Sequence, residues 1–319
     1  MTQQRGVNTQ ILLGFENVAF GTTATVGFVL PMNTCGITGV KARNSPATLT
    51  GTRNTVAPFT GNQGVNGPIV IPIDSAAMIY WLIAMFGDPT STGADPYVHE
   101  FKVASTMPSF TLEKAFTDLA VDVYERFVGC KIQSFGITIG GDGELVGNIA
   151  VLGAQMSHET SAFDAAPTTV TLARVENFDA AILEGGGALA NATELSINLD
   201  FGLDPNSFVI GGGGIRGDIP EGLVTVTGKL TTLFEDKTLL DKATGDTESS
   251  LQVTVTAAAS SIFELEIQEL LYSVNGVPIE GPQGLLVDLD FVGYYADGGE
   301  ASNIVARVTN GTASYDLIT

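Results

Sequence analysis

The chain has 319 residues, and 14 Lys and Arg stand against 35 Asp and Glu, giving a formal net charge of −21 at pH 7. So acidic a surface repels the phosphates of nucleic acids, which excludes tight DNA or RNA binding but still allows an acidic wall past which DNA slides. Charged residues make up only 15% of the chain, and the mean hydropathy is +0.26. We therefore expect much apolar surface to be buried, inside two domains of ordinary size and between subunits.

Neither a signal peptide nor a membrane span is expected. Residues Met1 to Gly14 lack the basic start and long apolar run of a signal peptide. The longest apolar stretch, Ala76 to Phe86, is too short to cross a bilayer. We therefore expect a protein that is made in the cytoplasm and has no membrane partner. Because that compartment is reducing, the two cysteines, Cys35 and Cys130, are expected to be buried thiols.

Alternating or β-branched runs bounded by Gly, Pro, Asn and Asp predict a mainly β protein. The predicted strands are, in chain order, Thr22 to Leu30, Ile69 to Ile73, Ile132 to Ile139, Leu145 to Leu152, Leu195 to Phe201, Leu223 to Leu230, Leu251 to Ala257, Ile262 to Ile267 and Leu285 to Tyr294.

Two short helices are predicted among these strands. Asp74 and Ser75 cap the first, and Gly87 ends it. This helix is apolar on nearly every side, so it should be sandwiched between the sheet and another layer. Asp236 begins a second, shorter helix that ends at Gly245.

Parts of the chain are repeated. Gly67 to Asp88 and Gly228 to Asp246 share the order glycine, apolar strand, acidic cap, helix and Gly-Asp. Gly141 to Gly153 aligns without gaps on Gly281 to Gly293. Repeated units in one chain usually stack or close into rings. We therefore predict an internal duplication.

The duplication predicts two tandem β-sandwich or barrel domains, each with one short helix and one long loop. Residues 1–160 would form an N-terminal arm and the first domain, and residues 161–319 the second, with a polar linker at about 158–170. Long Gly, Asn and Pro-rich loops precede the two strand-helix units, at Arg43 to Gly67 and Gly202 to Glu221. Loops of this length usually make functional contacts.

The residues give little support for chemistry. Gly212 to Gly217 has the spelling of a dinucleotide-binding turn, but a strand follows and no βαβ unit surrounds it, so we interpret it as a turn. His99 and His158 are the only histidines, and neither has metal-site spacing. We expect no enzyme, cofactor or metal.

Four carboxylates alternate with apolar residues on two predicted strands: Glu264, Glu266, Asp288 and Asp290. The period of two puts the apolar groups on one sheet face and the carboxylates on the other. Three interpretations remain open for this acidic face: an ordinary solvated strand face, the lining of an acidic lumen, and an acid-base pair of the kind found in glycosidases.

Several loop strings together carry a family resemblance. They are Ile11 to Glu16, Gly51 to Asn54 with Pro58-Phe59 and Gly61-Asn62, Gly211 to Leu223, and Ile279 to Gly284. In number and order these strings resemble the tail tube proteins of long-tailed bacteriophages, in their long, internally duplicated branch. The similarity runs from about Thr9 to Thr309.

The resemblance implies a structural virion protein of the phage tail, the major tail tube subunit. Such subunits form stacked rings with an inner β-barrel, a helix outside the sheet and long loops that reach the adjacent ring. A duplicated chain then predicts homotrimeric rings with pseudo-sixfold symmetry. The implied partners are further copies of the chain, the tape measure protein, the tail terminator and baseplate or initiator proteins, while DNA passes through the lumen without specific binding.

The resemblance also assigns roles to named residues. Glu264, Glu266, Asp288 and Asp290 are candidates for an acidic lumen face, and since the first copy has Asn148 and Ala150 where the second has Asp288 and Asp290, charge would alternate around a ring. Candidate contacts between rings or subunits are Arg53, Asn54, Gly61, Asn62, Gly211, Gly214, Arg216, Asp218 and Glu221. Arg53 and Arg216 could each pair with a carboxylate of the next subunit.

Other functions predict different behaviour. A terminator or baseplate ring would form closed rings that never lengthen. A non-viral β-sandwich binding module at the cell surface would carry an export signal. A carbohydrate-active enzyme would use Glu264 or Glu266 and would lose hydrolysis when Glu266 is replaced by Gln.

Overall fold

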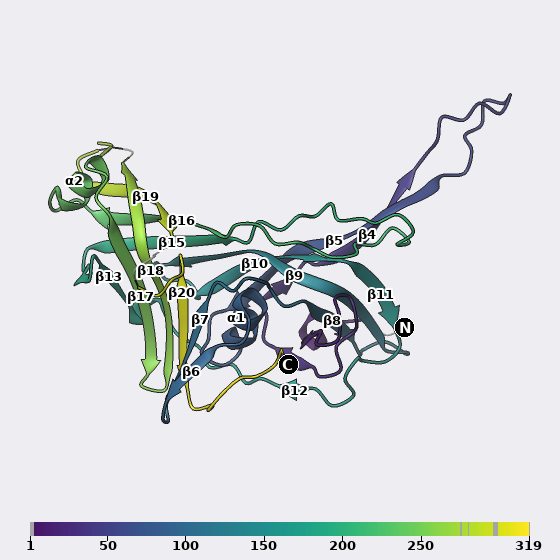
Figure 1. The fold of residues 1–319 in the computed structure, drawn as a ribbon, viewed down its shortest axis with the longest axis horizontal. Helices are drawn as coiled ribbons and strands as arrows, with labels where there is room; N and C mark the ends of the chain where they lie inside the picture. Colours follow the sequence, from purple (N-terminus) through teal and green to yellow (C-terminus); the bar gives the residue numbers. More distant parts are fainter. Residues whose placement is uncertain (1–2, 275, 280, 296–298, 319) are drawn as a thin grey trace.

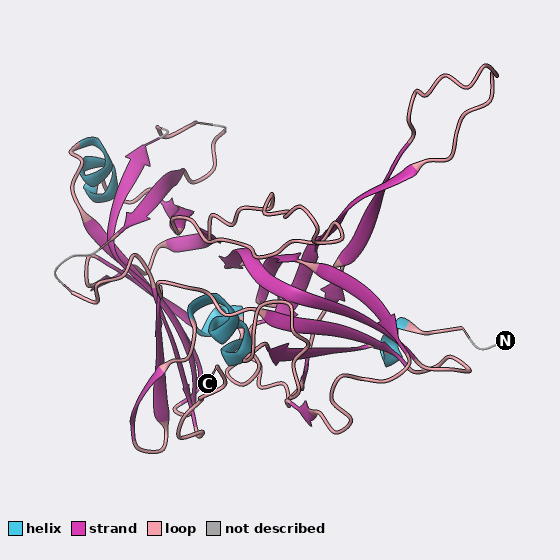
Figure 2. Cartoon of the chain, turned by 45° about the vertical axis from the view of Figure 1, so that its right-hand side comes forward, coloured by secondary structure: helices cyan, strands magenta, loops and turns pink. Residues whose placement is uncertain are grey.

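The computed structural model describes residues 3–274, 276–279, 281–295 and 299–318. Glu280, within the last of the resemblance strings, lies outside the described residues. The protein is mainly β, as predicted, and its strands belong to one extended, strongly bent sheet (Figures 1 and 2). The helical segments among the described residues are α1 (Met78–Phe86), α2 (Thr238–Thr244) and the 3-10 turns η1 (Gly6–Asn8) and η2 (Asn177–Asp179).

The first half of the chain contributes twelve strands: β1 (Gln10–Phe15), β2 (Phe28–Leu30), β3 (Thr34–Cys35), β4 (Thr38–Asn44), β5 (Phe59–Pro72), β6 (Thr90–Gly93), β7 (Tyr97–Lys102), β8 (Phe110–Phe116), β9 (Val123–Ile139), β10 (Val146–Gly153), β11 (Gln155–Glu159) and β12 (Thr168–Thr169). The described residues of the second half contribute eight: β13 (Ala180–Glu184), β14 (Gly187–Ala188), β15 (Ala192–Asp200), β16 (Thr225–Leu233), β17 (Ser249–Ala258), β18 (Ser261–Val274), β19 (Leu286–Tyr294) and β20 (Val305–Asn310).

Both halves contain the same six-stranded array. Its strand order is β4-β5-β10-β9-β8-β1 in the first half and β15-β16-β19-β18-β17-β13 in the second. Helix α1 follows β5, and α2 follows β16. A 3-10 turn precedes the outermost strand of each array, η1 before β1 and η2 before β13.

The register of the two arrays agrees as well. Gly67 lies opposite Val151 in the first half, and Gly228 lies opposite Phe291 in the second. These are the residue pairs that the two sequence alignments match. The β8-β9 ladder slips between Phe110 and Leu112, and the β17-β18 ladder slips at the corresponding place, between Ser249 and Leu251. Bulges mark specific positions in a strand, so a bulge shared by both arrays strengthens their equivalence.

Helix α1 occupies the core, as its all-round apolarity predicts. All nine of its residues are buried, and it lies beneath the sheet in Figure 1. The Asp74 carboxylate accepts hydrogen bonds from the amides of Ala76 (2.6 Å) and Ala77 (2.5 Å). Both amides lie just before α1, whose N-cap is Ala77, so Asp74 holds the turn that leads into the helix and does not cap it. Burial raises the pKa of Asp74. Gly87 ends the helix with a positive φ of 91°.

The two arrays are joined edge to edge. β15 of the second half pairs with β9 of the first, from Leu195 opposite Ile139 to Asp200 opposite Ser134. The C-terminal strand β20 returns to the first half and pairs with β7. One continuous sheet therefore crosses the middle of the chain, and the polar segment 158–170 runs from β11 through β12.

Candidate functional site

The connection between β15 and β16, residues 201–224, lies against the first half of the chain; we call it the long connection (Figure 1). The carbonyl of Gly214 accepts a 2.7 Å hydrogen bond from the amide of Gln63. The backbone of Gly214 lies beside Gly61 and Asn62. The structure thus brings residues from both predicted contact loops together within one chain.

Arg216 fixes the middle of the long connection. Its side chain is buried and donates to the carbonyl oxygens of Pro205 (2.7 Å) and Gly153 (2.5 Å). The guanidinium also lies over the ring of Phe208, 5.2 Å from the ring centre. Burial lowers the pKa of Arg216. Arg216 therefore points into its own chain and holds the Gly211 to Gly217 turn against β10.

Lys131 of β9 anchors the far end of the long connection. Its ammonium donates to the carbonyl of Ile219 (2.9 Å) and to the carboxylate of Glu221 (2.7 Å), with Asp218 at 3.6 Å. Burial alone would raise the pKa of Glu221, but hydrogen bonds from Lys131 and from the amide of Met107 outweigh it and lower that pKa. Lys131 was not among the predicted contact residues. The signal that could have identified it is its position as a lone cation within an apolar stretch of sequence.

The corresponding loop of the first half, residues 45–58 between β4 and β5, behaves differently. It projects away from the body with the ends of both strands (Figures 1 and 2); we call 44–59 the hairpin. Arg53 and Asn54 are exposed near its tip, and Leu49 is 97% exposed. The hairpin region is purely basic, because Lys41, Arg43 and Arg53 occur in a stretch, 17–73, that has no Asp or Glu.

The four candidate acidic residues form two separate groups. Glu264 and Glu266 of β18 both contact Arg307 of β20, at 2.7 and 2.5 Å. Arg307 also contacts Glu100 (2.9 Å) and Glu300 (3.0 Å), and we call these five residues the Arg307 cluster. Burial alone would lower the pKa of Arg307, but the surrounding carboxylates outweigh it and raise that pKa.

Asp288 and Asp290 lie on β19, beside β16. Asp288 contacts Lys229 at 2.7 Å and accepts a hydrogen bond from Thr231. The ammonium of Lys229 lowers the pKa of Asp288. Asp290 is exposed and lies opposite Lys229 in the β16-β19 ladder. The carboxylates of this group are therefore engaged with the adjacent strand.

The comparison with known families decides the identity. A family model described as phage tail tube protein matches residues 6–293, nearly the whole chain. The chain belongs to this family. A search of curated proteins finds no match. The resemblance drawn from the loop strings is thereby confirmed, and the tail tube protein is a structural component of the virion tail.

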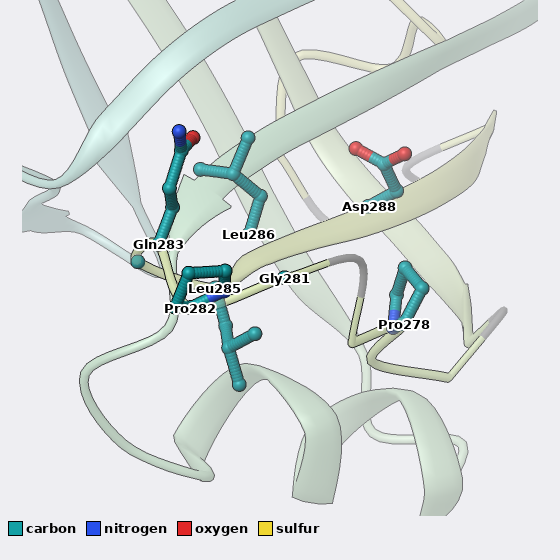
Figure 3. Close-up of a pocket in the computed structure, with 8 residues that line it drawn as sticks. Pro278, Gly281, Pro282, Gln283, Leu285, Leu286 and Asp288 are labelled. Carbon is teal, nitrogen blue, oxygen red and sulfur yellow. The ribbon is translucent and has the colours of Figure 1, made fainter.

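A depression with a volume of about 430 Å³ lies at the β18-β19 turn of the tail tube protein (Figure 3). Pro278, Pro282, Leu286 and Asp288 are among its lining residues. A similar depression of about 380 Å³ lies at the β9-β10 turn, where residues 141–145 and 174–178 line it. The two depressions occupy corresponding positions in the two arrays.

The described residues offer neither a metal site nor a membrane-spanning helix. Within the described ranges of this tail tube protein, no three His, Cys, Asp or Glu side chains are grouped to hold a metal ion. In that same part of the chain, no helix has the length and apolarity needed to cross a bilayer. Cys35 and Cys130 are free thiols; Cys130 is buried and burial raises its pKa, whereas Cys35 is partly exposed.

Proposed function

We propose that this chain is the major tail tube subunit, which polymerises as stacked rings into a hollow tube that conducts phage DNA and the tape measure protein. One observation carries the proposal within the family: the two halves share a strand order, a register and a bulge. Each chain then supplies two equivalent wall units by internal duplication. Three chains would supply six and close a homotrimeric ring with pseudo-sixfold symmetry.

Edge pairing gives the ring its physical basis. A sheet edge left open on one subunit is a template for a strand of another, and a closed ring leaves no such edge. The internal pairing of β15 with β9 supports this mode of growth, because it already joins two units edge to edge. Contacts between stacked rings do not close, so they propagate as a filament. Tail terminator and baseplate or initiator proteins would cap its two ends.

The acidic strand face is proposed to line the lumen. Glu264, Glu266, Asp288 and Asp290 alternate with the buried residues of β18 and β19, so they lie on the sheet face opposite the core. With a net charge of −21 per chain, such a wall would repel phosphates and let DNA pass without binding. The hairpin with Arg53 and the Gly211 to Glu221 segment are proposed as contacts between subunits or rings.

Negative-stain electron microscopy of the purified protein at rising concentration tests the proposal. We expect stacked rings and then hollow tubes, whose end-on views have six lobes with threefold modulation. Rings that never lengthen, even with an initiator complex present, would instead indicate a terminator or baseplate ring. A protein that stays monomeric under all these conditions would contradict the proposal.

A further inference from the structure

Within one chain, three contacts join the second half to the first. β15 pairs with the C-terminal part of β9. The long connection covers the neighbouring face of β9 and β10, where Lys131 lies opposite Leu152. The η2 segment packs on the β9-β10 turn: Asn177 donates to the carbonyl of Gly143 (2.8 Å), and Arg174 contacts Glu144 (2.9 Å). These three contacts define the internal junction.

In these three contacts the first half contributes the edge of β9, the face of β9 and β10, and the β9-β10 turn. Each of these surfaces has a counterpart in the second half. The register matches Leu152 with Val292 on β10 and β19, and Lys131 with Leu271 on β9 and β18. Leu152 is 4% exposed beneath the long connection, whereas Val292 is 53% exposed and Leu271 37%. Two apolar side chains thus stand uncovered where their equivalents are buried. The depression in Figure 3 corresponds in the same way to the depression that the η2 region lines.

Each of the three covering elements of the second half also has a counterpart in the first. β4 corresponds to β15, the hairpin to the long connection and η1 to η2. β4 pairs with β5 on one edge, and its residues are mostly exposed. The hairpin projects from the body (Figure 2). One side of the molecule therefore presents exposed covering elements, namely β4, the hairpin and η1. The other side presents the surfaces of the second half that no such element covers.

Charge favours the same pairing. The hairpin and β4 carry Lys41, Arg43 and Arg53 with no acidic residue nearby in the sequence. The uncovered side of the second half carries Glu248, which accepts a hydrogen bond from Tyr294 at the end of β19. A basic projection and an acidic receiving surface attract one another and set the direction of docking.

We propose that the junction between two chains repeats the internal junction: the β4 edge, the hairpin and η1 of one copy dock on β18, on the Leu271-Val292 pair and on the β18-β19 turn of a second copy. The inference rests on the proposed ring function and adds to it. It assigns the hairpin to a lateral contact inside one ring, rather than to the adjacent ring.

The internal register fixes the expected pairing between chains. Asp200 of β15 lies opposite Ser134 of β9. Through the β5 and β16 ladders, Asp200 corresponds to Val40, and through the β10 and β19 ladders, Ser134 corresponds to Ser273. Val40 of one copy should therefore lie opposite Ser273 of the next, an arrangement that strand addition at an open edge produces.

Cysteine cross-linking tests that register on the full-length chain. In a Cys35→Ser background, V40C and S273C proteins are purified apart, mixed under assembly conditions and oxidised. We expect a disulfide-linked dimer, and closed three-chain species from the V40C/S273C double variant. S134C/D200C is the internal positive control. V40C mixed with V121C is the negative control, because Val40 and Val121 are similarly exposed, at 65% and 66%.

A second measurement tests the covered face. V292D should abolish tubes while the circular dichroism and unfolding midpoint of the monomer stay unchanged, and V121D should still assemble. Normal tubes whose V40C and S273C cross-link no more than the negative control would overturn the inference and leave the proposed function standing. Cross-linked closed trimers from a protein that never forms tubes would support the junction and contradict the proposed function.

Discussion

Two lysines with similar partners allow a direct comparison of the internal junction with an open surface. Lys131 contacts Glu221 at 2.7 Å, and Lys229 contacts Asp288 at the same distance. The Lys131 side chain is 7% exposed, whereas that of Lys229 is 43% exposed. We predict that Lys131→Met lowers the free energy of unfolding by about 3 kcal/mol, because it leaves the partly buried Glu221 and the Ile219 carbonyl without their partner. Lys229→Met should cost less than about 1 kcal/mol, since water screens that pair.

Urea unfolding of the two monomeric variants, followed by circular dichroism and compared with the parent protein, measures both effects. Lys131→Met should also expose the long connection to limited proteolysis, because Ile219 and Glu221 would lose their anchor. Equal losses of stability in the two variants would refute the idea that the long connection is held at the junction by Lys131.

Three further predictions follow from single contacts. Glu221→Gln should make the free energy of unfolding less sensitive to acid. The pKa of Glu221 is lowered in the folded protein, so its stabilising contribution is present above the unfolded pKa of about 4.3 and is lost as pH falls through the folded value. Unfolding midpoints measured over a pH series test this. Arg307→Met should lower the free energy of unfolding by about 3 kcal/mol in urea unfolding, because Glu264 and Glu266 lose their cationic partner while Lys102 still contacts Glu100 and Glu300, and Arg307→Lys should recover part of the loss. Gly228→Ala should lower the free energy of unfolding by about 1 to 3 kcal/mol, since a Cβ there would overlap the Ser196 carbonyl and the Phe291 ring. Gly143→Ala is the control: its Cβ would point into open space, so the unfolding free energy should hardly change in the same assay.

The sequence predicted the central strands of both arrays because glycines and apolar periodicity mark them locally. Each predicted strand overlaps an observed one, and the aligned glycines, Gly67 and Gly228, lie at matching ladder positions. The predicted caps at Asp74 and Asp236 were displaced: the N-caps are Ala77 and Lys237, although each carboxylate accepts a hydrogen bond from a backbone amide close to the helix start. These features depend on local residues, so they can be recognised without tertiary contacts.

Two of the missed strands, β8 and β20, have a physical explanation. β8 carries Glu113 and Lys114 in buried positions, where Arg126 (2.7 Å) and Glu125 (2.9 Å) neutralise them. β20 carries Arg307, which four carboxylates surround. Because these charges find their partners on other strands, the alternation that marks a half-buried strand is absent from the local sequence.

The candidate site was predictable in outline only. Loop length singled out both loops, but nothing in the local sequence distinguishes the long connection, which Arg216 and Lys131 hold against their own chain, from the projecting hairpin. That difference arises because one loop has a neighbouring array within the same chain and the other does not.

Cryo-electron microscopy of assembled tubes tests the central claim most directly. The account predicts three chains per ring, six wall units around the lumen, and a chain-to-chain seam in which Val40 faces Ser273 as Asp200 faces Ser134 inside the chain. A ring of six chains, or a seam in which β18 pairs with a strand other than β4, would contradict it.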